Sequence, residues 1–500
     1  MAIKDEKRMF VGIVWNCAAE LKLILTALLF LGTLATILQF TPSRFTISSA
    51  DDISSCISTT NSSSPVSDLI TNSNSNSNSS STNNSSSQIN RDELLSDGVL
   101  KRFFNPYGSA AYNFVLMSAY RGGNNTFAVV GLSSKPLHVY GNPTYQCRWV
   151  PRNDPLNSIS VSGYKILPDW GYGRVYTVVV VNCTFPAAAA GGGQLFVEAS
   201  TNGGGDRDLN TTDTILALDE SPEAFANFTA RFNSKPKYDY LYCGSSLYGN
   251  LSPQRMREWL AYHVRLLGPK SHFVVHDAGG VHEGLREVLR PWVEKGFVTL
   301  QDIREQERFD GYYHNQFLIV NDCLHRYKFD AKWMFFFDVD EFIFVPKKTT
   351  IKSVLDSFSD FTQLTIQQMP MSNKLCLSQD APTAFRKWGF EKLVYKDVKG
   401  RVRRDRKYAV QPRNVFATGV HMSQNLIGKS TYKTEGRIKY FHYHGTIAER
   451  HEPCRQFVNS TAITVDETPY VVDSTMRDIA GVVKKFELSM IGSRLQRTRQ

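Results

Sequence analysis

Cysteine and long apolar runs are both scarce in this sequence. Eight cysteines in 500 residues are too few for a small disulfide-built domain, so hydrophobic cores must stabilise the folded parts. The chain has no CxxC motif or His/Cys cluster typical of structural zinc. With 42% hydrophobic and 21% charged residues, it is not a collagen, a wholly disordered chain or a multispan transporter. The net charge of +10 is modest and could reflect nucleic acid, anionic lipid, an acidic polymer or no charged partner at all.

One apolar run, residues 23–40, is long enough to cross a bilayer at ~1.5 Å per residue. Lys4, Lys7 and Arg8 precede it, so the positive-inside rule places residues 1–22 in the cytosol. The alternative is a cleaved signal peptide, but no short apolar core followed by an Ala-x-Ala-like site is present. We predict an N-terminal single-pass transmembrane helix and a type II topology.

Residues 41–98 have the composition of a disordered stem, since residues 71–87 are all Ser, Thr or Asn. Six N-x-Ser/Thr glycosylation motifs lie beyond residue 100, at Asn124, Asn182, Asn210, Asn227, Asn250 and Asn459. They indicate a lumenal body in the secretory pathway, which argues against nucleic acid as a partner. Six cysteines of this body can form disulfides in an oxidising lumen, although their pairing cannot be read from the sequence.

Residues 99–232 have the pattern of a small all-β sandwich. Short apolar or β-branched runs occur at residues 126–132, 175–181 and 195–199, and glycine clusters separate them. Trp149 and Trp170 are candidates for stacking on sugar faces and binding an acceptor. The alternative for each ring is a place in the hydrophobic core.

Residues 233–500 alternate between strand and helix patterns. Strands are expected at 240–243, 272–276, 297–300 and 333–337, and helices at 253–267, 282–295 and 316–327. Ser252 and Gly268 have the residue types that begin and end the first helix. This alternation predicts an α/β domain with a mostly parallel sheet, which binds ligands at the carboxyl ends of its strands.

An acidic motif follows the last of these strands. Asp338, Asp340 and Glu341 come directly after a run of five apolar residues, where carboxylates are costly unless a cation meets them. Alternation along an extended chain puts Asp338 and Asp340 on the same side, which suits a divalent ion held partly by substrate phosphates. The alternatives are a structural turn and an aspartyl phosphatase, but Phe342 stands where the latter needs threonine.

Several segments resemble glycosyltransferase family 92 in order and spacing. They are residues 242–250, 257–260, 321–324 and 337–342, followed less specifically by 419–421 and 441–444. The architecture as a whole resembles the plant pectic galactan synthases of that family. The resemblance implies a GT-A-like (Rossmann-like mixed sheet) catalytic domain over residues 233–500, preceded by a carbohydrate-binding module at 99–232. It also implies inverting transfer of galactose from UDP-galactose to β-1,4-galactan on an acidic pectic backbone, with Mn²⁺, at the Golgi membrane.

The resemblance also assigns roles to individual residues. Asp338 and Asp340 match the family's metal and diphosphate motif. His442 matches the histidine of its His-Tyr block and is expected as a third metal ligand, with His421 as another candidate. His444 stands where relatives often have a basic residue and is expected to contact donor phosphate.

An inverting mechanism needs a general base, and Asp380 and Glu391 are the candidates between the metal motif and the histidine block. A surface carboxylate is the alternative for each. The donor nucleotide is expected at the ends of the first two strands, next to Gly244, Ser245, Ser246 and Asp277. For Asp277 the alternative is a turn or helix-capping residue.

The basic run at residues 396–407 suits an acidic polysaccharide, with Arg403 and Arg404 as acceptor contacts; the alternative is a solvated loop. Two other functions stay open at this point. One is a membrane-tethered glycan-binding protein with an inactive transferase fold. The other is a family 92 enzyme that uses UDP-arabinopyranose, which lacks only the hydroxymethyl group of UDP-galactose. A homodimer is compatible with a stem-tethered enzyme.

Overall fold

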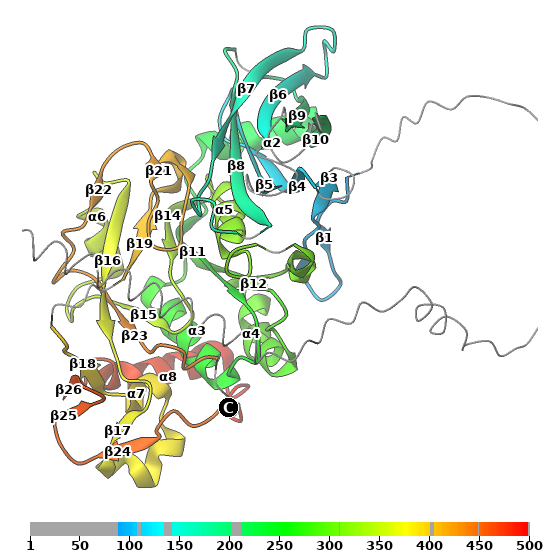
Figure 1. Ribbon diagram of the computed structural model, residues 1–500. Coiled ribbons are helices and arrows are strands. Elements are labelled where there is room, and N and C mark those ends of the chain that lie inside the picture. Colours follow the sequence, from blue (N-terminus) through cyan, green and yellow to red (C-terminus); the bar gives the residue numbers. More distant parts are fainter. Residues whose placement is uncertain are drawn as a thin grey trace, which may run out of the picture. The chain divides into compact units, whose positions relative to one another are not determined.

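The computed structural model describes residues 89–498, apart from short gaps at 108–111, 135–142, 174, 188, 202–211, 310, 401–404 and 449 (Figure 1). The predicted cytosolic tail and anchor lie outside the described residues, as do most of the stem and both Arg403 and Arg404. Within the described part of the chain, no helix has the length and apolar character to span a membrane. The described residues all fall in one unit, Ser86–Gln500.

The first large element is an antiparallel sheet of eight strands, drawn in blue to green in Figure 1. The strands are β3 (Asn105–Tyr107), β4 (Phe114–Arg121), β5 (Thr126–Ser134), β6 (Thr144–Pro151), β7 (Ile159–Ile166), β8 (Tyr176–Thr184), β9 (Gly193–Ser200) and β10 (Thr212–Glu220). Their order is β10-β9-β6-β7-β8-β5-β4-β3. The sheet curls until β10 meets β4, where Asn113 donates to Asp213 at 2.6 Å and Arg121 pairs with Glu220. The predicted β-sandwich is therefore wrong, because one nearly closed sheet takes the place of two stacked ones.

Both faces of this curled sheet are buried along most of β4, β5 and β8, whereas β6, β7, β9 and β10 bury mainly the inner face. Phe114 and Leu116 of β4 point into the interior of the curl, around Trp149 and the Cys147–Cys183 disulfide. Val115 and Met117 point outward and pack against helix α5 (Gln316–Arg326). Alternate side chains along a strand point to opposite faces, so burial of both faces explains the continuous apolar runs in these strands.

The second large element is a mixed sheet of eleven strands. They are β1 (Glu93–Leu94), β2 (Leu100–Lys101), β11 (Tyr238–Leu247), β12 (Ser271–Asp277), β13 (Val298–Asp302), β14 (Ala331–Phe336), β15 (Glu341–Phe344), β16 (Gln363–Pro370), β19 (Arg406–Val410), β22 (Ser430–Thr431) and β23 (Lys439–His442). The order is β1-β2-β13-β12-β11-β14-β19-β16-β23-β15, with β22 beside β16. Strands β2, β13, β12, β11 and β14 run parallel to their neighbours in that stretch.

Helices cover both faces of this sheet near β11. The side chains of Tyr240 and Tyr242 pack with helices α3 (Pro253–Leu267) and α4 (Glu283–Glu294), whereas Leu241 and Cys243 pack with α5. Helix α3 begins and ends where predicted: the Ser252 hydroxyl accepts from the N–H of Arg255 at 3.3 Å, and Gly268 takes φ +81° at the other end. The Cys243–Cys323 disulfide joins β11 to α5.

The α/β fold class predicted for the catalytic part is wrong. The described residues contain 26 strands and seven α-helices, and alternation ends at β14. Parallel strands need a crossover of a dozen or more residues, but the next helices, α6 (Ile351–Asp356) and α7 (Gly389–Lys392), are too short. The later chain therefore pairs largely antiparallel, as β19 does with β14 and β16, and β15 with β23.

The remaining elements are small. Helix α2 (Pro222–Asn233) follows β10, and α8 (Arg477–Ile491) packs against α3, where Arg257 and Glu487 form a buried ion pair at 2.6 Å. The short strands are β17 (Leu375–Leu377), β18 (Tyr395–Asp397), β20 (Val415–Ala417), β21 (Asn425–Leu426), β24 (Gln456–Val458), β25 (Ala462–Val465) and β26 (Thr468–Val472). The third disulfide, Cys376–Cys454, lies in this region.

Candidate active site

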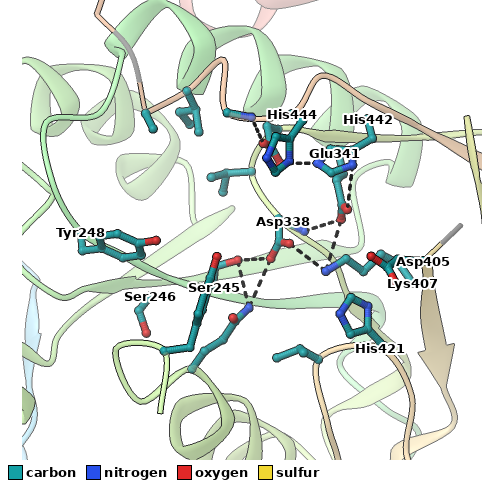
Figure 2. A pocket seen from close by; sticks show the side chains of 18 of the residues that line it. Ser245, Ser246, Tyr248, Asp338, Glu341, Asp405, Lys407, His421, His442 and His444 are labelled. Carbon is teal, nitrogen blue, oxygen red and sulfur yellow. Dashed lines mark hydrogen bonds and ion pairs between the residues drawn. The ribbon is translucent and has the colours of Figure 1, made fainter. Parts of the chain in front are cut away.

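A cavity of about 580 Å³ opens beside the carboxyl ends of β11 and β14 (Figure 2). Parallel strands β11 and β14 end at this edge, so the residues that follow each strand meet there. Ser245 and Ser246 come from β11, and Asp338 and Asp340 follow β14. The cavity is also lined by residues from three later segments, 405–407, 420–421 and 442–448.

Asp338 is held by three donors. One carboxylate oxygen accepts from the Ser245 hydroxyl and, at 3.2 Å, from the Gln316 amide. The other accepts from the Lys407 ammonium at 2.7 Å. Burial opposes ionisation, but the charge and hydrogen bond of Lys407 outweigh it and lower the pKa of Asp338 to about 2. Asp338 is therefore ionised at neutral pH, with its oxygens facing Lys407 and Ser245.

Lys407 also lies 3.7 Å from Glu341. The Glu341 side chain is buried and accepts from the backbone N–H of Asp338 at 2.7 Å. Burial, helped by the nearby charge of Asp338, raises the pKa of Glu341 to about 8, although Lys407 opposes this rise. The role of Glu341 in this structure is to hold the turn after β14, and Lys407 is the cation that makes the acidic motif tolerable.

Asp340 belongs to a different cluster. Its ligand atoms and those of His442 and His444 all lie within 4.8 Å of one another. Asp340 accepts from the backbone N–H of Gly445 at 2.8 Å and lies 3.5 Å from His442 Nε2. The other nitrogen of His442 is 2.6 Å from the Gln368 amide. Burial opposes the imidazolium, but the hydrogen bond and charge of Asp340 raise the pKa of His442.

His421 lines the cavity outside that cluster. Its Nδ1 lies 3.1 Å from the carbonyl oxygen of Arg406. Burial and the charge of Lys407 lower its pKa, whereas Asp405 opposes the shift. Asp405 is exposed and also lines the cavity, so the Asp405 carboxylate and the His421 imidazole both face it (Figure 2).

The residues expected to bind donor fall into two groups. Ser245 and Ser246 line the cavity. Gly244 lies behind them, and a Cβ there would come within 1.7 Å of the Tyr242 hydroxyl, so its absence serves packing. Asp277 is buried at the end of β12 and accepts from the backbone N–H groups of Gly279 and Val281 at 2.9 and 3.1 Å, which is the work of a turn residue.

The two carboxylates expected as general bases are not at the cavity. Asp380 lies in a 3₁₀ helix (Ser378–Arg386), paired with Lys387 and Arg477. Glu391 lies in α7, paired with Lys484. Neither lines the cavity, so the geometry offers no route from either to an acceptor hydroxyl. Both are engaged in ion pairs that tie their segments to α8.

Of the two tryptophans expected to bind an acceptor, one lines the cavity and the other does not. Trp149 is 1% exposed and stacks on Phe127 inside the curled sheet, with centroids 4.9 Å apart, so no sugar reaches its faces. Trp170 is 55% exposed and lines the cavity. The core alternative describes Trp149, and only Trp170 is available to a ligand.

Several residues of the cavity were not anticipated from the sequence, among them Lys407, Gln316 and Asp405. Lys407 is part of the basic run, where it looks like any other exposed charge, and only the pairing of β19 with β14 brings it to Asp338. Gln316 begins α5, and no motif marks it. Asp405 immediately precedes β19; a carboxylate within a basic run was the one available signal.

Comparisons with known proteins identify the family of this chain. Residues 238–481 match the model of glycosyltransferase family 92. Galactan β-1,4-galactosyltransferase GALS3 of Arabidopsis thaliana is 58% identical over 99% of this chain and 98% of its own length. GALS1 of the same plant is 52% identical over 79% of each chain. The β-1,4-galactosyltransferase galt-1 of Caenorhabditis elegans is 25% identical over 47% of this chain and 57% of its own. The chain therefore belongs to glycosyltransferase family 92 and is an enzyme of sugar transfer.

Proposed function

We propose that this enzyme transfers galactose from UDP-galactose to the end of a β-1,4-galactan chain, with inversion at the transferred carbon. The observation that carries the proposal is the pair of clusters on one cavity: Asp338 with Lys407, and Asp340 with His442 and His444. The names of the relatives supply galactose and galactan.

A divalent metal ion fits the second cluster. One carboxylate and two imidazoles are ligands of divalent first-row ions, and the carboxylate is the one that suits Mn²⁺. Their ligand atoms lie within 4.8 Å of one another. The Gln368 amide contacts His442, and the N–H of Gly445 donates to Asp340. In metal sites such outer hydrogen bonds fix the orientation of the ligands. A bound ion would stabilise the negative charge that develops on the departing UDP. We propose Asp340, His442 and His444 as ligands in place of the earlier set that included Asp338 and His421.

The other cavity residues then have distinct tasks. Lys407 provides a buried positive charge next to the donor phosphates, and Ser245 and Asp338 orient the nucleotide by hydrogen bonds. Asp405 is the exposed carboxylate among the described cavity residues. We propose Asp405 as the general base: it takes the proton of the acceptor hydroxyl as that oxygen bonds to the galactose carbon and the bond to UDP breaks.

The setting of the enzyme is part of the proposal. Three disulfides support an oxidising compartment, and we propose the Golgi lumen, with galactan carried on an acidic pectic backbone as acceptor. UDP-arabinopyranose is the competing donor. A pocket that tells two sugars apart by one hydroxymethyl group discriminates by roughly 10–200-fold, so the two donors must be compared directly.

The test measures UDP release with a galactan oligomer as acceptor, with and without Mn²⁺, for UDP-galactose and UDP-arabinopyranose. Asp340→Asn should lower kcat at least ~100-fold and weaken Mn²⁺ binding in calorimetry by at least ~10–100-fold, the loss that follows even when an outer partner of a ligand is removed. The matched control is Asp154→Asn, an exposed carboxylate of the curled sheet that pairs only with Asn157 among the described residues. Unchanged Mn²⁺ binding by Asp340→Asn refutes the ligand set, and a preference for UDP-arabinopyranose refutes the donor.

A further inference from the structure

Four exposed aromatic rings line one wall of the cavity, and the proposed chemistry uses none of them. They are Trp170, Tyr172, Tyr312 and Tyr313, which we call the aromatic wall. Their exposed fractions are 55%, 60%, 40% and 59%. Large rings gain most from burial, so a group of four left open inside a cavity indicates a ligand that covers them.

The aromatic wall is continuous although it comes from two separate parts of the chain. Trp170 and Tyr172 lie in the loop between β7 and β8 of the curled sheet, and Tyr312 and Tyr313 lie just before α5. Neighbouring ring centroids are 6.0 Å apart for Trp170 and Tyr172, and 5.5 Å for Tyr172 and Tyr312. Tyr313 follows at 6.2 Å from Tyr312. The curled sheet thus contributes directly to the cavity that holds the catalytic clusters.

The loop of the curled sheet holds its rings in place. Trp170 and Gly171 both adopt left-handed backbone conformations, with φ of 55° and 81°. The buried Asp169 fixes the turn by accepting from the N–H of Gly171 at 3.1 Å and from the Thr177 hydroxyl at 2.6 Å. Trp170 Nε1 donates to the Gln424 side chain at 3.3 Å. Trp170 is therefore presented in one orientation rather than left free.

The second half of the wall is held at a conformational cost. Tyr313, His314 and Asn315 are three consecutive left-handed residues, with φ between 52° and 55°. The Asn315 amide secures them by donating to the Gln306 side chain at 2.5 Å, and the Ser246 hydroxyl donates to the His314 carbonyl at 2.8 Å. Such a segment persists only where its surroundings impose it, and these segments gather at binding sites.

We propose that the aromatic wall binds the acceptor chain, with its rings stacked on the sugar residues that precede the one receiving galactose. This inference rests on the proposed function and names the acceptor subsite of the same cavity. The wall carries no charged side chain, which favours a neutral glycan over a diphosphate, whose charge is met by Lys407. A hexose ring has an apolar C–H face that a flat aromatic ring can cover, and tyrosine hydroxyls can bond the sugar hydroxyls around it.

The proposal predicts a dependence on acceptor length. A dimer reaches little of the wall, whereas a hexamer extends along it. Trp170→Ala and Tyr172→Ala should each raise KM for the hexamer about tenfold, the loss expected when about 50 Å² of apolar contact is removed at about 25 cal/mol per Å². KM for the dimer should rise by less than about twofold, and KM for UDP-galactose should stay at the wild-type value. Trp170→Phe, which keeps a ring, should recover most of the hexamer affinity.

The control variant is Tyr164→Ala. Tyr164 is 67% exposed on β7 of the same sheet but does not line the cavity, so its loss should leave the length dependence intact. An equal rise in KM for dimer and hexamer, or a rise in KM for UDP-galactose, would overturn the proposal by assigning the rings to the reacting sugar or the nucleotide. If the wild-type enzyme transfers no galactose, the proposed function fails. If it does and both ring variants behave as wild type, only the acceptor subsite fails.

Discussion

Arg102 joins the two large sheets, and its replacement by methionine tests how strongly they are held together. The guanidinium is buried and donates to both oxygens of Asp322 on α5 at 2.7 and 2.8 Å. It also donates to Gln301 of β13 at 2.6 Å and to Ser118 of β4 at 2.9 Å, and pairs with Asp92 at 2.9 Å. Five contacts, from two strands, one helix and the segment before β1, converge on one cation.

The magnitude follows from what methionine leaves behind. Asp322 is buried, and burial alone would raise its pKa, but Arg102 and Arg326 outweigh that effect and lower it. After the change, Asp322 keeps only Arg326 at 3.6 Å as a counter-charge, with Tyr120 at 2.5 Å as a hydrogen-bond donor. Removing one partner of a buried ion pair costs about 3–5 kcal/mol. With about 400 residues at about 2.1 cal/mol/K each, Tm should fall by about 4–6 °C.

Thermal unfolding followed by intrinsic fluorescence measures the change, with Arg152→Met as control. Arg152 pairs with Asp219 on the surface of the curled sheet, so its loss should cost less than about 1 kcal/mol. The double variant Arg102→Met, Asp322→Leu should be more stable than Arg102→Met alone, because it removes the stranded carboxylate. A Tm within about 1 °C of wild type for Arg102→Met, or a double variant that shows the sum of both losses, would refute the reasoning.

Three further predictions concern pH and the cavity. Burial lowers the pKa of His263, His276 and His325 to about 3 each. Below about pH 6.5 these histidines bind protons in the unfolded chain but not in the folded one, so the free energy of unfolding should fall by about 1.4 kcal/mol per pH unit per histidine. His325→Gln should therefore make the denaturation midpoint depend less steeply on pH. Asp405→Asn should lower kcat about 100-fold or more without changing donor KM in steady-state assays of UDP release, and an unchanged kcat would contradict its role as general base. Lys407→Met should raise the donor Kd in calorimetry about tenfold and should also lower kcat, because it removes a positive charge next to the proposed donor phosphates. Unchanged donor affinity would contradict the proposed role of Lys407 in binding the donor.

The sequence predicted the strands and helices between residues 238 and 337 well, for a physical reason. Helix α3 has both its capping residues in the sequence, and the apolar run at residues 333–337, most of it in β14, is bounded by Lys332 and Asp338. Local signals of this kind depend on the residues within one element. The pairing of β19 with β14 depends on residues more than seventy positions apart. No local pattern specifies it, so the antiparallel pairing of strands beyond β14 was missed.

The predicted site residues that lie at the cavity are likewise those with a local signal in the sequence. Asp338 and Asp340 were found because the cost of carboxylates after a buried strand is visible in the sequence itself. Asp380 and Glu391 were chosen by their position between two motifs, and position along the chain says little about position in space. Their ion pairs with α8 came only with the fold. The burial of Trp149 could not be predicted either, because the sequence does not show whether the ring of a strand residue lies inside the curled sheet or outside it.

Helix α5 explains how the curled sheet and the catalytic cavity act as one site. At its first turn, Gln316 donates to Asp338, and Phe317 packs edge-on against Trp170 with centroids 6.4 Å apart. Further along, Asp322 pairs with Arg102 and Cys323 is linked to Cys243 of β11. A displacement of this helix would therefore move the aromatic wall and an Asp338 contact together. One helix that contacts both sheets therefore positions both parts of the proposed site, the aromatic wall and the Asp338 carboxylate.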